Sequence, residues 1–151
     1  TVLCVGLGQA MAIAMAEREK ESKRLLRLRT CLLDGIRARI EGVTVNGSLD
    51  ARVPGNLNLS FAGVNSETLM MELRDLALST GAACSSASLE PSYVLEALGV
   101  EDALARSSIR IGIGRLTTQA EIDYAIDAFA EKVKKLRIHG TSQRPKSATA
   151  N

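Results

Sequence analysis

The sequence is poor in aromatic residues, cysteine, proline and histidine. Its 151 residues include two Phe, two Tyr and no Trp, so we expect a core of aliphatic side chains. The three cysteines are few, widely spaced and odd in number, which argues against a disulfide framework and for a reducing compartment. No apolar run reaches the roughly 18 residues of a membrane-spanning helix. A net charge of +2 is too small to indicate binding to nucleic acid or to a membrane.

The overall composition is that of one globular domain. Apolar residues make up 46% of the chain and charged residues 24%, which are ordinary proportions for such a domain. A length of 151 residues suffices for one core and not for two. The chain begins TVLCVGLG, within apolar sequence and without an initiator Met. We therefore expect it to be a piece of a longer protein.

Hydrophobic periodicity predicts an α+β fold. Spacing of three and four residues predicts helices over residues 9–40, 65–77, 91–98 and 118–139. Alternation predicts strands over residues 56–61 and 107–114. Residues 43–50 are predicted to be a short strand that ends in a turn at Asn46-Gly47. We predict a small sheet with helices mainly on one face. This domain is expected to occupy residues 1–138, with a flexible polar tail over residues 139–151.

Local signals define several of these helix ends. Pro91 suits the first helical position, and Gly99 suits the position just after a helix. Thr118 and Glu121 have the spacing of a capping box, which predicts the start of the last helix. Gly140 is expected to end that helix.

Four features carry little chemical information. The GLGQA stretch (residues 6–10) lacks the third glycine of a dinucleotide-binding loop and is interpreted as a helix entrance. His139 is expected to be a solvated cation near a helix C-terminus, not a catalytic base. Cys4 and Cys31 lie in apolar or helical sequence and are predicted to be small core residues. No cluster of His, Cys, Asp and Glu has metal-site spacing.

Arg110 lies in SIRIGIG, where three isoleucines share one strand face. The other face carries Arg110 followed by Gly112 and Gly114, so a small anion has room to approach the guanidinium. Arginine binds a carboxylate through two parallel hydrogen bonds. An ordinary surface salt bridge is the alternative, and the pattern alone favours it.

Cys84 lies in TGAACSSASLEPS, among glycine, alanine and serine, where the apolar pattern stops. Small neighbours allow a segment to move and a partner to approach closely, and a thiolate is a strong nucleophile. These features indicate a mobile nucleophile. Taken alone, they fit a structural or incidental thiol equally well.

The stretch LALSTGAACSSASLEPSYVLEALG followed by SSIRIGIGRLTTQAEIDYAID resembles the C-terminal part of cysteine desulfurases. The resemblance is to the iron–sulfur-assembly (IscS/NifS-like) subgroup, and it includes the NGSLD turn and the PGNLNLSF strand. It implies the smaller, C-terminal domain of a fold-type-I pyridoxal-phosphate enzyme. The large domain of that family, with its Schiff-base lysine and cofactor-stacking histidine, has no counterpart in this chain.

The resemblance implies a role for both candidates. Cys84 matches the cysteine that becomes persulfidated, and it is also implied as a transient iron–sulfur ligand together with a scaffold protein. Arg110 matches the arginine that holds the substrate carboxylate. Asn56 falls near the rim of the family's active site and receives no role. Pyridoxal 5′-phosphate is expected to be bound mainly by the large domain, and no resident metal is expected.

The function implied for the full-length protein is removal of sulfur from L-cysteine, giving L-alanine and a persulfide. The implied partners are an iron–sulfur scaffold or another sulfur acceptor and a second copy of the protein. The implied compartment is the cytoplasm, or the mitochondrial matrix in a eukaryote. A sulfur-carrier or interaction module without catalysis is the alternative, because the cofactor lysine is missing. Selenocysteine lyase is a third interpretation, against which the serine-rich stretch after Cys84 argues.

Overall fold

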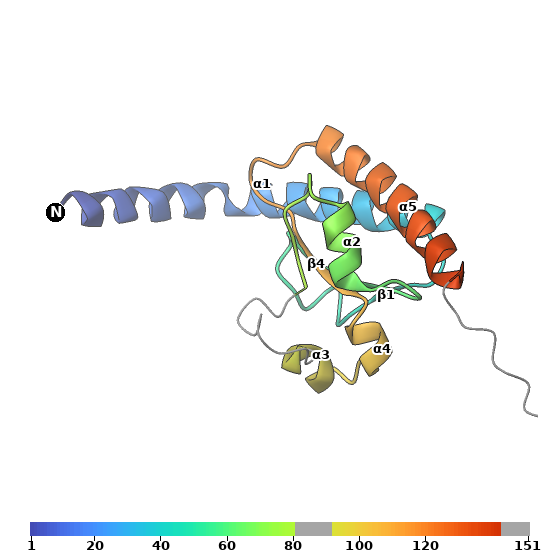
Figure 1. Ribbon diagram of the computed structural model, residues 1–151. Coiled ribbons are helices and arrows are strands. Elements are labelled where there is room, and N and C mark those ends of the chain that lie inside the picture. Colours follow the sequence, from blue (N-terminus) through green and yellow to red (C-terminus); the bar gives the residue numbers. More distant parts are fainter. Residues whose placement is uncertain (81–91, 143–151) are drawn as a thin grey trace, which may run out of the picture.

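The structure is a computed structural model that describes residues 1–80 and 92–142. Its elements are, in chain order, α1 (Val2–Arg39), β1 (Val43–Val45), β2 (Asn56–Phe61), α2 (Ser66–Glu72), β3 (Leu78–Ser79), α3 (Tyr93–Ala97), α4 (Asp102–Ala105), β4 (Ser108–Gly112) and α5 (Gln119–Ser142). Helices and strands are mixed along the chain, as the periodicity predicts (Figure 1).

The strands form one antiparallel sheet in the order β1-β2-β4-β3. Strand β4, the last in the chain, therefore lies between β2 and the edge strand β3. Leu59 of β2 is paired with Ile109 of β4, and Leu57 is paired with Ile111. Paired residues point to the same side of a sheet, so the aliphatic residues of both strands form one continuous apolar face.

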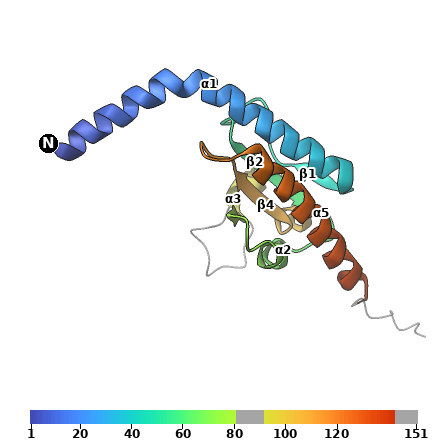
Figure 2. The same cartoon turned by 90° about the horizontal axis from the view of Figure 1, so that it is seen from above.

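This apolar face is buried against α1 and α5, which lie side by side over it (Figure 2). Leu57, Leu59 and Ile109 are fully buried. Phe61 stacks on Phe129 of α5 with ring centroids 5.3 Å apart. The core is aliphatic apart from this pair, as the composition predicts. The fold class is confirmed: an α+β arrangement with its long helices on one face of a small sheet.

The N-terminal helix is longer than predicted. Helix α1 begins at Val2, not at residue 9, so GLGQA is inside the helix and its interpretation as a helix entrance is wrong. Cys4 is exposed, so its assignment to the core is also wrong. The physical reason is that only the C-terminal half of α1 crosses the sheet. The first half carries large exposed apolar side chains, among them Val2, Leu3, Val5, Leu7, Met11 and Met15.

Other boundaries differ where the chain must turn to join the sheet. Helix α2 ends at Glu72, not at residue 77, because the chain then forms the edge strand β3, which the sequence did not predict. Helix α4 was also missed. Helix α3 begins at Tyr93 with Ser92 as N-cap, and Pro91 lies outside the described residues. Gly99 follows α3 with a φ of 71°, which confirms its predicted role.

The last helix starts as predicted and ends later. Glu121 Oε2 accepts hydrogen bonds from the Thr118 backbone N (2.7 Å) and from Thr118 Oγ1 (3.0 Å), which confirms the capping box. Helix α5 continues to Ser142, so Gly140 does not end it. The division at residue 138 remains a prediction. None of the helices in the described ranges combines the length and apolar character that a membrane crossing requires.

Candidate functional site

A row of four polar residues crosses the face of the sheet that α1 and α5 leave uncovered. Arg110 of β4 is paired with Asn58 of β2 on one side and with Ser79 of β3 on the other. Asn46 follows β1 directly, and its backbone N donates to Asn58 O (3.0 Å), which continues the pairing by one residue. Asn46, Asn58, Arg110 and Ser79 therefore form one transverse line, which we call the polar row.

Arg110 is the exposed cation of this row. Its Nη2 lies 3.4 Å from Ser79 Oγ, a long hydrogen bond. Within residues 1–80 and 92–142, no ion pair joins Arg110 to a carboxylate, so the salt-bridge interpretation finds no support there. A Cβ added at Gly112, two residues along the same face, would meet no atom within 4 Å. As far as residues 1–80 and 92–142 are concerned, the predicted open space beside the guanidinium is present.

Buried hydrogen bonds fix the other half of the polar row. Asn46 is only 4% exposed, and its Nδ2 donates to Asn58 Oδ1 (2.7 Å) and to Ser60 Oγ (2.8 Å). Ser60 Oγ in turn donates to the Leu104 carbonyl at the end of α4 (2.7 Å). Asn58 is therefore held from the side opposite to Arg110. The alternation in NLNLSF predicted the face for Asn58 and Ser60, but nothing local identified Asn46 as their partner.

Two arginines that the sequence did not single out hold the segment after β1. Arg29 is 7% exposed, and its Nη2 donates to Leu49 O (2.9 Å). Arg52 donates from Nε to Ser48 O (2.5 Å) and from Nη2 to Asn46 O. Burial, and secondarily the charge of Arg29, lower the pKa of Arg52. Both arginines therefore donate to backbone carbonyls of the segment after β1, and Arg52 holds the Asn46 carbonyl directly.

Cys84 lies outside the described residues, and its predicted role is not tested by the geometry. The last described residue before it is Thr80, which directly follows Ser79 of the polar row. Cys84 is four positions after Thr80 in the sequence, and a fully extended chain spans at most about 14 Å over that length. The covalent structure therefore limits how far the Cys84 backbone lies from the strand beside Arg110.

The described lysines and the single histidine lie away from the polar row. The five described lysines all lie on α1 or α5, across the sheet from Arg110, and three pair with glutamates: Lys23 with Glu19, Lys132 with Glu131 and Lys135 with Glu72. His139 is exposed on α5, and its Nδ1 lies 2.7 Å from Lys135 O. No group of three metal-ligating side chains occurs in the part of the chain that is described.

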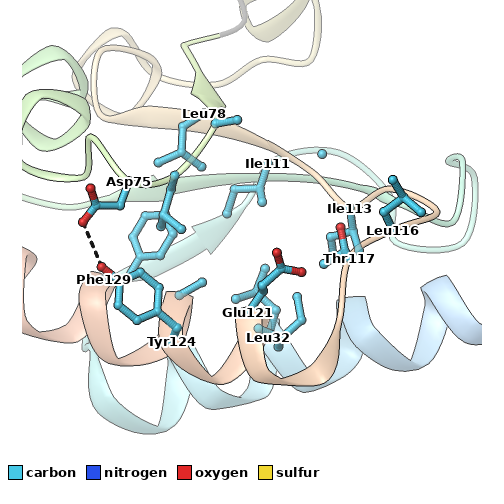
Figure 3. A pocket seen from close by; sticks show the side chains of 15 residues that line it. Leu32, Asp75, Leu78, Ile111, Ile113, Leu116, Thr117, Glu121, Tyr124 and Phe129 are labelled. Carbon is cyan, nitrogen blue, oxygen red and sulfur yellow. Dashed lines mark hydrogen bonds between the residues drawn. The ribbon is translucent and has the colours of Figure 1, made fainter.

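A cavity of about 380 Å³ lies on the apolar side of the sheet, between β3, β4 and α5. Leu78, Ile111 and Phe129 line it, with Tyr124 and Asp75 at one end and Leu116 and Thr117 at the other (Figure 3). Tyr124 Oη donates to Asp75 (2.9 Å), and this bond raises the pKa of the tyrosine. The cavity and Arg110 are on opposite faces of the sheet, so they do not form one site.

The sequence and the fold match one family of proteins. The model of the aminotransferase class-V family matches residues 1–125, and the chain belongs to this family. Among solved structures, a NifS-like protein superimposes with a TM-score of 0.74 at 27% identity, covering 87% of this chain and 33% of its own. A NifS-like protein from Rickettsia africae ESF-5 matches with a TM-score of 0.72 at 22% identity, which supports the fold alone.

Two curated relatives of this chain share one name. The cysteine desulfurase IscS of Anaeromyxobacter sp. (strain K) is 56% identical over 133 residues, or 88% of this chain. The cysteine desulfurase IscS of Vibrio cholerae serotype O1 (strain M66-2) is 59% identical over the same length. The chain spans about a third of the length of these relatives, 33% in both cases. The resemblance seen in the sequence is thus confirmed at the level of the family.

Proposed function

We propose that this chain is the C-terminal small domain of a cysteine desulfurase, with Cys84 as sulfur-accepting nucleophile and Arg110 as the residue that binds the substrate carboxylate. The observation that carries the proposal is the setting of Arg110. It is exposed, lacks a carboxylate partner among the described residues and faces open space at Gly112. The segment with Cys84 begins two residues after Ser79, its neighbour in the polar row.

Arg110 would orient the substrate. Its guanidinium offers two parallel N–H donors to a carboxylate, which fixes direction as well as position. Its backbone belongs to β4, which is paired on both sides, so the cation is held on a rigid support. Positioning of this kind turns a bimolecular encounter into a reaction between groups already aligned.

Cys84 would take the sulfur. Its thiolate attacks the sulfur of L-cysteine, an S–S bond forms, and the bond from that sulfur to the substrate β-carbon breaks. The electron pair stays with the β-carbon, which takes up a proton to become the methyl group of L-alanine. Cys84 is left as a persulfide. No external oxidant or reductant is needed in this step, because the transferred sulfur loses the two electrons that the substrate β-carbon gains.

The cofactor belongs to the full-length protein. Pyridoxal 5′-phosphate acts as an electron sink in enzymes that cleave bonds next to an amino acid's α-carbon. Because the described lysines are on the far side of the sheet from Arg110, we propose that the cofactor lysine lies outside this chain. The isolated chain is accordingly expected to lack desulfurase activity.

The relatives support a proposal about the partners and the compartment of the full-length protein. Proteins named cysteine desulfurase IscS are the most similar ones reported above, and we propose an iron–sulfur scaffold or another sulfur acceptor as the partner of the Cys84 persulfide. With a scaffold bound, Cys84 would be a transient iron–sulfur ligand. We further propose a homodimer in the cytoplasm, or in the mitochondrial matrix of a eukaryote.

The test uses the full-length protein, purified with pyridoxal phosphate and incubated with L-cysteine. Alanine formation and protein-bound persulfide are measured for wild type, Cys84→Ser and Arg110→Gln. We expect C84S to lose persulfide and turnover. We expect R110Q to raise KM about 10- to 100-fold, as for loss of a charged bidentate contact. Unchanged alanine release in C84S would remove the role of Cys84, and an unchanged KM in R110Q would remove that of Arg110.

A sulfur-carrier module without catalysis is the second candidate. The position of the described lysines, all on α1 or α5, favours it. The isolated chain and the full-length protein are compared for the visible absorbance band of bound cofactor. Persulfide that appears on the chain only when a separate desulfurase is added would support the carrier, whereas a cofactor band and turnover in the full-length protein would exclude it.

A further inference from the structure

The hydroxyl of Ser60 determines the orientation of two side-chain amides beside Arg110. Ser60 has one hydroxyl proton, and it is donated to the Leu104 carbonyl at 2.7 Å. Toward Asn46, Ser60 Oγ then acts as an acceptor, and Asn46 Nδ2 lies 2.8 Å from it. In this orientation Asn46 Oδ1 is buried without a hydrogen-bond partner among the described residues. Asn46 Nδ2 also lies 2.7 Å from Asn58, whose facing atom must then be Oδ1.

As a consequence, Asn58 Nδ2 is a donor with a fixed direction and without a partner among the described residues. Asn46 and Arg110 flank Asn58 on opposite sides of the polar row, so turning Oδ1 toward Asn46 leaves Nδ2 on the Arg110 side. No hydrogen bond of Asn58 Nδ2 to another described residue is present. Directly paired residues of an antiparallel sheet have Cα atoms about 4.5–5.5 Å apart, so the two side chains leave the sheet from adjacent positions on one face. The guanidinium itself contacts Ser79, with Nη2 3.4 Å from Ser79 Oγ.

Asn58 and Arg110 have no acceptor to offer each other. Arginine has only donors, and the Asn58 oxygen is already used by Asn46. The paired positions therefore present N–H groups and no oxygen acceptor between them. Gly112 keeps the adjoining space open. A small anion with two oxygens is the complement of this arrangement, because one oxygen can accept from the guanidinium and the other from the amide.

We propose that Asn58 is a second binding residue for the α-carboxylate of the amino acid substrate, and that Asn46 is the positioning residue that keeps its Nδ2 turned toward Arg110. This inference rests on the proposed function, since it assigns Arg110 to the same carboxylate. Unlike the proposed function, the inference predicts that β2 also contributes to carboxylate binding. The contribution comes from the neutral side chain of Asn58, whose orientation is set by a buried chain of hydrogen bonds.

The experiment uses the full-length protein and compares Asn58→Ala and Asn58→Asp with a matched control, Asn56→Ala. Asn56 lies on the same face of the same strand, opposite Gly112. N58D keeps the acceptor for Asn46, replaces the donor with an oxygen and adds a negative charge next to Arg110, so it should oppose the substrate carboxylate without breaking the buried chain. The KM for L-cysteine is measured together with inhibition by L-alanine and by ethylamine, which is alanine without its carboxylate.

We expect N58A to raise the KM and the L-alanine Ki about tenfold, as for one hydrogen bond to a charged group, and N58D to raise them at least as much. The ethylamine Ki should not change, and N56A should resemble wild type. Asn46→Ala should raise KM less, and N46A/N58A should equal N58A, because Asn46 acts through Asn58.

The possible failures are distinguishable. If R110Q weakens L-alanine binding and the Asn58 variants do not, the inference is overturned and the proposed function stands. If the Asn58 variants weaken ethylamine as much as L-alanine, their effect is structural and the inference is also overturned. If R110Q leaves both constants unchanged, the carboxylate site itself is wrong and both proposals fall.

Discussion

Gly55 and Gly112 allow one substitution to be compared at two neighbouring positions of the sheet. Neither glycine has a positive φ, so alanine fits the backbone at both. A Cβ at Gly55 would lie 2.2 Å from the Ile113 carbonyl oxygen, whereas a Cβ at Gly112 would meet nothing within 4 Å. The two replacements therefore differ only in what the new methyl group touches.

Gly55→Ala should destabilise the chain strongly. The obstructing atom is backbone, so relief requires β4 to move away and the hydrogen bond from Ile113 N to Gly55 O (2.7 Å) to lengthen. Overpacking costs about 1–3 kcal/mol and a lost hydrogen bond about 1 kcal/mol, which gives a loss of about 2–4 kcal/mol. For a domain of this size the melting temperature should fall by roughly 5–15 °C.

Gly112→Ala should behave oppositely. With no contact to relieve, it should leave stability unchanged or raise it by about 0.4–1 kcal/mol through the unfolded chain. Both variants are measured by thermal and urea denaturation followed by circular dichroism. A Gly55→Ala variant within about 0.5 kcal/mol of wild type, a change expected of an ordinary surface substitution, would refute the reasoning from the Ile113 contact. So would equal losses in both variants.

Two further predictions concern the helices. Gly35→Ala should destabilise wild type, because its Cβ would lie 2.4 Å from Ile126 Cδ1 and overpacking of about 1–3 kcal/mol exceeds the helix gain of about 1 kcal/mol. In an Ile126→Ala background the same change should stabilise by about 1 kcal/mol, and a loss in both backgrounds would contradict this reasoning. The hydrogen bond from the Thr118 backbone lowers the pKa of Glu121, so wild type should exceed Glu121→Gln in stability above pH 4.5, the ordinary pKa, and lose this advantage as the pH falls through the lowered value. A urea-denaturation difference that stays constant from neutral pH to strongly acidic pH would refute the second prediction.

The strands could be predicted from the sequence because each has one buried face. The alternation in NLNLSF gives β2 its bounds and places Leu57, Leu59 and Phe61 in the core, as observed. The same pattern in SIRIGIG separates Arg110 from the neighbouring isoleucines. Alternation is a local property that survives in any sheet with a single covered side, so both predictions are independent of strand order.

The partners of these strands could not be predicted in the same way. Pairing of Asn58 with Arg110 depends on β4 entering the sheet between β2 and β3, which no local pattern specifies. Strand β3 has only two residues, too few for periodicity to identify. The start of α1 was missed because a helix that covers no core has no apolar stripe to count. Arg110 was identified as a candidate from the local sequence pattern, whereas the residues around it could be identified only from the fold.

Helix α4 is only four residues long, yet its last turn influences groups far from its own surface. The Leu104 carbonyl accepts the hydroxyl proton of Ser60. Through this hydrogen bond it influences the orientation of the Asn46 and Asn58 side-chain amides, and Asn58 lies on the strand next to Arg110. Substitutions in residues 102–106 that tilt this carbonyl would thus retune ligand affinity while touching no ligand. A survey restricted to side chains near the guanidinium would overlook them.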